Sequence, residues 1–109
     1  MPISTKKTSD GKVIVKVDSD LDTIELAASF KDALQTLYDG GESEVVLDLD
    51  NVRLINSNGI GKILMFHKRF ADRGGQFYYK SPLKGVVKDL FETLLLTKLL
   101  KEYKSVGGD

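Results

Sequence analysis

The sequence predicts a single α/β domain in which short strands alternate with helices, and three observations support this fold class. The segment 45–49 is short, rich in β-branched residues and bounded by turn formers, as buried central strands are. Helical patterns of apolar residues lie before and after it, which predicts parallel pairing. With 109 residues, 41% of them hydrophobic, the chain can form one core that buries about 65% of its unfolded surface. No repeat or linker divides 1–109 into smaller domains.

The N-terminal segment predicts a hairpin or an edge strand. The apolar stretch 13–17 follows a turn signal, Ser9-Asp10-Gly11, and a weaker strand segment around Ile3 precedes that turn.

A first helix is predicted between two sets of boundary residues. Asp22 or Thr23 can cap its amino end, and Gly40-Gly41 can close its carboxyl end. One stripe at helical spacing is expected to face the core: Ala27, Phe30, Ala33, Leu34 and Leu37.

A second helix is predicted over 58–73, after Leu54 and Ile55 extend the strand layer, and Gly74-Gly75 ends it. The inward stripe is expected to hold Ile60, Ile63, Leu64, His67 and Phe70, with His67 as a hydrogen-bonded core histidine. The other side is expected to carry Lys62, Met65, Phe66, Arg69 and Arg73. Exposed Met65 and Phe66 beside Lys62 and Arg69 predict a docking face, unless Phe66 folds back under a neighbouring loop.

The C-terminal third predicts a strand at 76–79 and a third helix that Ser81-Pro82 opens. Four residues of that helix are expected to point inward: Val86, Val87, Leu90 and Phe91. By propensity alone, 94–103 is helical. The tail 105–109 is expected to be loose.

The composition excludes several classes of function. The 16 Lys and Arg residues balance 16 Asp and Glu residues, so no overall positive field attracts nucleic acid or anionic lipid. Without cysteine and with a single histidine, the chain has no disulfide framework and no multi-histidine metal site. The start of the chain is polar, and no apolar run approaches the ~20 residues that span a bilayer. We therefore expect a cytoplasmic protein that binds neither membrane nor nucleic acid.

The most informative position is Ser57, where an apolar strand turns into the second helix. The hydroxyl of a serine at such a junction can cap the helix, which is the ordinary role of serine there. It can also seat a phosphate, because backbone N–H groups and the helix dipole favour negative charge at this point.

The same residues carry a family resemblance. Asn56-Ser57-Asn58-Gly59, after the strand Leu47-Asp48-Leu49 and before Ile60-Gly61, resembles the Asp-Ser-Ser/Thr-Gly-Leu-Gly motif of STAS domains of the bacterial anti-sigma factor antagonist type. Asp20-Leu21-Asp22 is similar to the family's Gly-Glu-Leu-Asp segment, which lies beside the serine, and 91–103 is similar to the segment after its third helix. Two positions depart from the pattern: Asn56 replaces an acidic residue, and Leu95 replaces a glycine.

The resemblance implies a mixed sheet of four to five strands with helices mainly on one face, and a last strand at about 99–103. It implies that Ser57 is phosphorylated by an anti-sigma factor that is also a serine kinase, and dephosphorylated by a PP2C-type serine phosphatase. The chain would then be a substrate and a switch rather than an enzyme, and would need no cofactor of its own. Partner contact is expected from the residues around the serine: Asp20, Asp22, Asn56, Asn58, Gly59, Gly61, Lys62, Met65 and Phe66.

Two alternatives stay open at this point. A phosphoaspartate receiver would use Asp48 or Asp50 as acceptor, with Asp18 and Asp20 holding magnesium. A STAS domain without phosphorylation would serve as a scaffold or as a subunit of a signalling or transport complex, and the neutral Asn56 favours this alternative.

Overall fold

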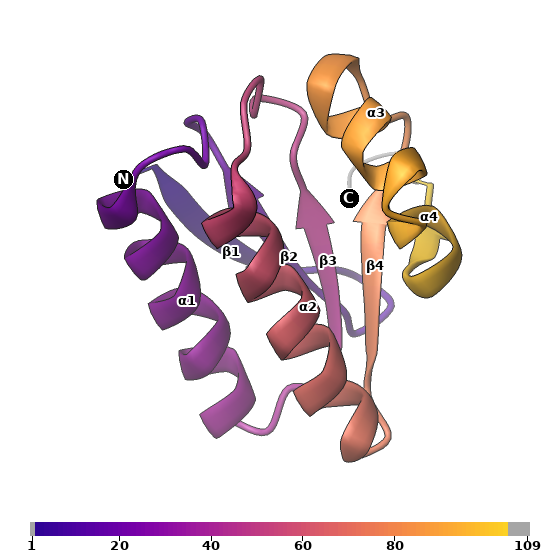
Figure 1. Cartoon of the computed structure of the whole chain (residues 1–109). Helices are drawn as coiled ribbons and strands as arrows, with labels where there is room; N and C mark the ends of the chain where they lie inside the picture. Colours follow the sequence, from indigo (N-terminus) through magenta and orange to yellow (C-terminus); the bar gives the residue numbers. More distant parts are fainter. Residues whose placement is uncertain (1, 105–109) are drawn as a thin grey trace.

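The computed structural model describes residues 2–104 and forms one mixed sheet covered by helices (Figure 1). In chain order the elements are β1 (Ile3–Lys7), β2 (Val13–Val17), α1 (Ile24–Asp39), β3 (Glu44–Asp48), α2 (Ser57–Asp72), β4 (Gln76–Lys80), α3 (Gly85–Thr93), α4 (Leu96–Leu99) and β5 (Lys101–Tyr103). The predicted N-terminal hairpin and the first two helices are therefore confirmed.

The strands lie in sequence order, β1-β2-β3-β4-β5. β1 pairs antiparallel with β2, and each later pair is parallel. Every crossover from β2 onward moves the chain one position in the same direction, so right-handed connections put all the helices on one face of the sheet. Figure 1 shows α1 and α2 side by side over the sheet, with α3 and α4 beyond α2. The predicted mixed sheet with helices on one face is confirmed.

The main core lies between the sheet and the helices. Alternate residues of the central strands point into it, among them Val15, Leu47 and Phe77, each 0% exposed. On the opposite face Ile14, Val46 and Tyr103 form a smaller buried cluster, against which Tyr78 packs.

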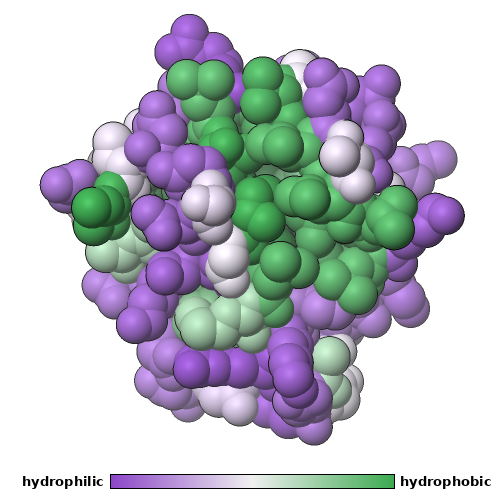
Figure 2. Space-filling model, viewed as in Figure 1, coloured by the Kyte–Doolittle hydropathy of each residue, from purple (hydrophilic) through white to green (hydrophobic). Residues whose placement is uncertain are grey.

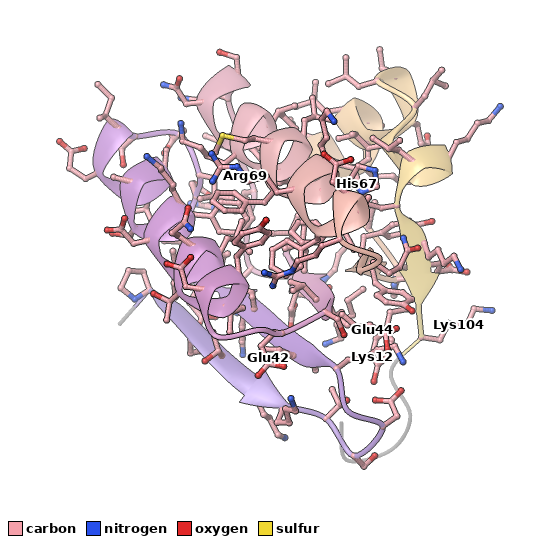
Figure 3. The ribbon with its side chains drawn as sticks, turned by 90° about the horizontal axis from the view of Figure 1, so that it is seen from below. Lys12, Glu42, Glu44, His67, Arg69 and Lys104 are labelled. Atoms are coloured by element: carbon pink, nitrogen blue, oxygen red, sulfur yellow. The ribbon has the colours of Figure 1, made fainter. Side chains whose placement is uncertain are left out.

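The predicted core stripe of α2 is partly wrong. The buried residues of this helix are Gly59, Ile60, Ile63, Phe66 and Phe70. Phe66, expected on the outer side, is 0% exposed, whereas Leu64, expected inside, is 39% exposed. α1 packs against one side of α2, so the buried stripe of α2 lies closer to α1 than the sequence predicted. Figure 3 shows Arg69 on the α1 side of α2 and His67 on the side toward α3.

The C-terminal segment combines both expectations for 94–103. Helical propensity is correct for α4, and the strand that the family resemblance implied is correct for β5, which pairs with β4. α3 begins at Gly85 rather than at Ser81-Pro82, because the N–H of Ser81 still donates to the carbonyl of Tyr103 in the sheet, at 3.1 Å. The predicted loose tail 105–109 lies outside the described residues.

Candidate functional site

Asn56, not Ser57, caps α2. The Oδ1 atom of Asn56 accepts from the backbone N–H of Asn58 at 3.0 Å and of Gly59 at 3.2 Å. Ser57 is the first residue of the helix and is exposed, and its hydroxyl bonds to no other residue within 2–104. The capping alternative for Ser57 is therefore wrong, and its hydroxyl is free for chemistry in solvent.

The loop before Ser57 is held by the segment that follows β2. The carboxylate of Asp20 accepts from the backbone N–H of Arg53 at 2.7 Å and of Leu54 at 3.1 Å. Leu21 forms a parallel bridge with Ile55, so the expected closeness of Asp20-Leu21-Asp22 to the serine is confirmed. The Arg53 N–H bond, aided by that of Leu54 and by the Arg53 guanidinium, lowers the pKa of Asp20. Asp20 therefore positions the Ser57 loop, while Asp22 is exposed beside the bridge.

The two glycines after Ser57 have different surroundings. A Cβ on Gly59 would lie 2.8 Å from Cγ1 of Ile55 and 3.2 Å from the carbonyl oxygen of Leu21, so packing requires glycine there. A Cβ on Gly61 would meet no atom within 4 Å. Glycine at position 61 weakens the helix without serving the core, which points to a role on the surface.

An apolar groove runs between the first half of α2 and the end of α3, and Ser57 lies on its edge. Its volume is about 320 Å³, and it is lined by Ile55, Asn56, Ser57, Ile60, Gly61, Leu64, Leu90 and Leu94. None of these side chains is charged. Figure 2 shows apolar residues gathered over the region where Figure 1 places α2 and α3.

A second groove lies on the other side of α2, against α1, and it is cationic. Its volume is about 400 Å³, and it is lined by Ile24, Ala27, Ala28, Lys31, Asn58 and Lys62. Neither lysine forms an ion pair with another residue of the described chain. Asn58 and Lys62, two of the residues expected to meet a partner, therefore face a different groove from Ser57.

The predicted docking face around Met65 and Phe66 does not exist as expected. Phe66 is fully buried, and Met65 is half-buried against the main core. Arg69 lies 5.2 Å from the ring centre of Phe66 and donates to Gln35 of α1 at 3.0 Å. Arg69 therefore joins α2 to α1, and the exposed apolar surface of α2 lies on the α3 side.

The family model of the STAS domain matches residues 4–108 of the sequence. The chain belongs to the STAS domain family. No curated protein sequence matches it significantly.

Solved structures agree with this STAS assignment. A Thermotoga maritima protein, TM1081, proposed to be an anti-sigma factor antagonist, matches with a TM-score of 0.82 and 27% identity, over 95% of this chain and 87% of that one. The phosphorylated form of SpoIIAA, a cell fate determinant of Bacillus, matches with a TM-score of 0.74 and 12% identity, over 96% and 92% of the two chains. The murine anion transporter Slc26a9 matches with a TM-score of 0.63 and 17% identity, over 87% of this chain and 16% of that one. The last two likenesses show the shared fold alone.

The acidic residues of the receiver alternative are engaged separately in this STAS domain. Asp48 and Asp50 both pair with Lys80, at 3.4 and 3.2 Å, while Asp18 accepts from the side-chain amide of Asn51 at 2.6 Å. No group of three or more potential metal ligands occurs within residues 2–104. Receivers have the strand order 2-1-3-4-5, which differs from the order here, so the receiver alternative is wrong.

Sequence reasoning missed three leucines of the STAS groove: Leu64, Leu90 and Leu94. The spacing of Ser57, Gly61 and Leu64 contains a usable signal, because residues four and seven positions apart share one face of a helix. Leu90 and Leu94 could not be assigned to the same groove, since their approach to α2 depends on how α3 is placed.

Among the described helices, none has the length and apolarity needed to cross a bilayer.

Proposed function

We propose that this STAS domain is an anti-sigma factor antagonist that switches partners through phosphorylation of Ser57. The observation that carries the proposal is the position of the Ser57 hydroxyl. It is exposed, it is released from capping by Asn56, and it lies at the edge of an uncharged apolar groove. In the unmodified state, an anti-sigma factor that is also a serine kinase covers the groove and this hydroxyl together.

Phosphorylation ends this complex through a local change of charge. A phosphoserine carries about −1.5 to −2 charges and needs water or cations around it. The groove beside Ser57 provides no cation, because Lys31 and Lys62 line the other side of α2. Covering the phosphate with an apolar partner surface is therefore unfavourable. The helix N-terminus tolerates the new charge, so the fold of the domain stays the same.

The chain acts here as a substrate rather than as an enzyme. The kinase partner supplies ATP, magnesium and the catalytic base, and a PP2C-type serine phosphatase restores the free hydroxyl. Asn56 keeps the cap that an acidic residue would also form, since Asn and Asp are comparable at this position. It removes one negative charge next to the phosphate. We place the single domain, 1–109, in the cytoplasm with these partners.

The test uses the purified chain and the purified anti-sigma factor kinases of the source organism. One kinase is expected to add a single phosphate, which peptide mapping locates at Ser57. Ser57→Ala is expected to remain unphosphorylated and to bind that kinase as the wild-type chain does. Ser57→Asp is expected to weaken binding by tenfold or more, where tenfold corresponds to about 1.4 kcal/mol.

Ser43→Asp is the matched control, because Ser43 is also an exposed serine. It lies before the amino end of β3, whereas Ser57 lies beyond the carboxyl end of that strand. Ser43→Asp should bind normally. If Ser57→Ala and Ser57→Asp both bind a partner as tightly as wild type, the domain is a scaffold, and phosphorylation is not its switch. If phosphate is found only at another residue, the proposal is also wrong.

A further inference from the structure

Leu95 has a backbone conformation that suits glycine and not leucine. Its φ and ψ angles are 60° and 25°, in the left-handed region, and it is the one non-glycine residue of the described chain with a positive φ. An L-residue with a Cβ atom is destabilised in this region, whereas glycine is not. The position follows the end of α3, where glycine is strongly preferred for this reason.

Packing does not compensate for this unfavourable conformation. The side chain of Leu95 is 57% exposed. Its backbone N–H donates to the carbonyl of Glu92 at 3.1 Å, but any residue other than proline would make that bond. Two further leucines at the same corner are nearly half exposed, Leu94 at 49% and Leu99 at 45%. Neither the local backbone nor the core explains a leucine at position 95.

We propose that Leu95 is a binding anchor for the protein partner that contacts Ser57. Leu94 lines the apolar groove whose edge holds Ser57, and the exposed Leu95 directly follows it at the end of α3, so Leu95 lies next to the groove. A partner that covers the hydroxyl and the groove extends over this corner. Because the groove has no charged side chain, the partner segment that lies on it is apolar. This inference rests on the function proposed above and adds a residue that selects the partner.

The test compares Leu95→Gly and Leu95→Asn in binding to the purified anti-sigma factor kinase that phosphorylates Ser57. Both replacements suit a left-handed backbone and remove the apolar side chain. Losing the burial of one leucine at an interface is expected to weaken binding by about tenfold or more. The melting temperature of Leu95→Gly is expected to stay the same or rise by up to about 5 °C, because the strained conformation is relieved.

Val86→Asn is the control, because Val86 lies on α3, the helix that precedes Leu95, and does not line the groove. The sequence predicted that Val86 points inward, but it is 44% exposed at the start of the helix. It lies about 12 Å from Leu94 along α3, at 1.5 Å per residue. Normal binding by Val86→Asn, with weak binding by both Leu95 variants, supports the anchor.

Three results would overturn the proposal. If both Leu95 variants bind like wild type while Ser57→Asp does not bind, the anchor is wrong and the proposed switch stands. If no kinase binds the wild-type chain, the proposed function fails, and the anchor fails with it. If sedimentation shows that the chain self-associates and that Leu95→Gly abolishes this, a second copy of the chain covers the corner instead of the partner.

Discussion

The two halves of α2 differ in what surrounds them. Over 65–72 the helix is tightly packed: Phe66 and Phe70 are 0% exposed, and the Phe70 ring lies 5.3 Å from that of Tyr38 and 5.1 Å from that of Phe77. Over 57–64 the helix has a groove on each side, and it carries Ser57 and Gly61 on its surface. One helix therefore makes aromatic contacts at its carboxyl end and presents an exposed hydroxyl at its amino end.

This division explains how a modification can change binding without changing the fold. Both halves of α2 contribute buried side chains to the core, Ile60 and Ile63 in the first half and Phe66 and Phe70 in the second. Just after the helix, Arg73 lies 3.7 Å from the ring centre of Tyr38. The start of the helix is also held by the side-chain Oδ1 of Asn56, which accepts from two backbone N–H groups, and by the carboxylate of Asp20, which accepts from the backbone of the preceding loop. A new charge on Ser57 acts on none of the buried contacts.

The largest expected difference is between Phe70→Ala and Leu64→Ala. Removing the buried Phe70 ring should lower the free energy of unfolding by about 3–5 kcal/mol. Leu64 is 39% exposed, so its truncation should change stability by only about 0.5 kcal/mol. Leu64→Ala should instead weaken binding to the anti-sigma factor kinase, because this side chain lines the groove beside Ser57. Denaturant titration and calorimetric binding measure the two effects.

Phe70→Leu is the milder variant if Phe70→Ala does not fold, and it should also lose stability. The comparison would break if Leu64→Ala lost several kcal/mol of stability, since the side of α2 that faces the groove would then also belong to the core.

A smaller contrast is expected between the two glycines of the first half. Gly59→Ala places a methyl group 2.8 Å from Ile55, and overpacking of this kind costs about 1–3 kcal/mol of stability. Gly61→Ala meets no atom within 4 Å and should stabilise the helix by about 0.5–1 kcal/mol. The same methyl group narrows the groove, so Gly61→Ala should bind the kinase more weakly than wild type does. If Gly61→Ala is more stable and binds normally, Gly61 has no role in binding at the surface.

The order of strands and helices from β1 to α3 could be predicted from the sequence, because apolar periodicity and turn residues mark these elements locally, whereas β5 followed only from the family resemblance. The serine at the junction could also be found, since a strand, a turn and an amphipathic helix meet there within a few residues. Which residue caps the helix could not be decided, because Asn56 and Ser57 are both good capping residues and only the backbone geometry separates them.

The prediction of a docking surface around Met65 and Phe66 was a larger error than the choice of the capping residue. The pattern of α2 has apolar residues on more than one side, and periodicity alone cannot tell which side packs against α1 and which side faces α3. Phe66 and Leu64 exchanged their expected places for this reason. The groove also needs Leu90 and Leu94, whose positions depend on tertiary packing and not on any local signal.

The smallest expected effect is a pH dependence of stability that arises from His67, on the side of α2 toward α3. Burial lowers the pKa of His67, and its Nδ1 atom, expected to be hydrogen-bonded, has no partner among the described residues. The unfolded chain, with a histidine pKa of about 6.5, therefore takes up a proton at a higher pH than the folded chain does. Stability should be full above about pH 6.5 and should fall as the pH drops below that value toward the lower pKa of the folded state.

Because His67 is the only histidine of the chain, His67→Gln isolates this effect. The variant can differ from wild type in overall stability through its lost contact with Phe77, whose ring centre lies 6.3 Å away, but that difference does not depend on pH. In denaturant titrations from about pH 7 to 5, the free energy of unfolding of the wild-type chain should fall, and that of His67→Gln should fall less steeply. Equal slopes would mean that His67 takes up its proton as readily in the folded chain as in the unfolded one, and that the packed half of α2 admits water on its α3 side.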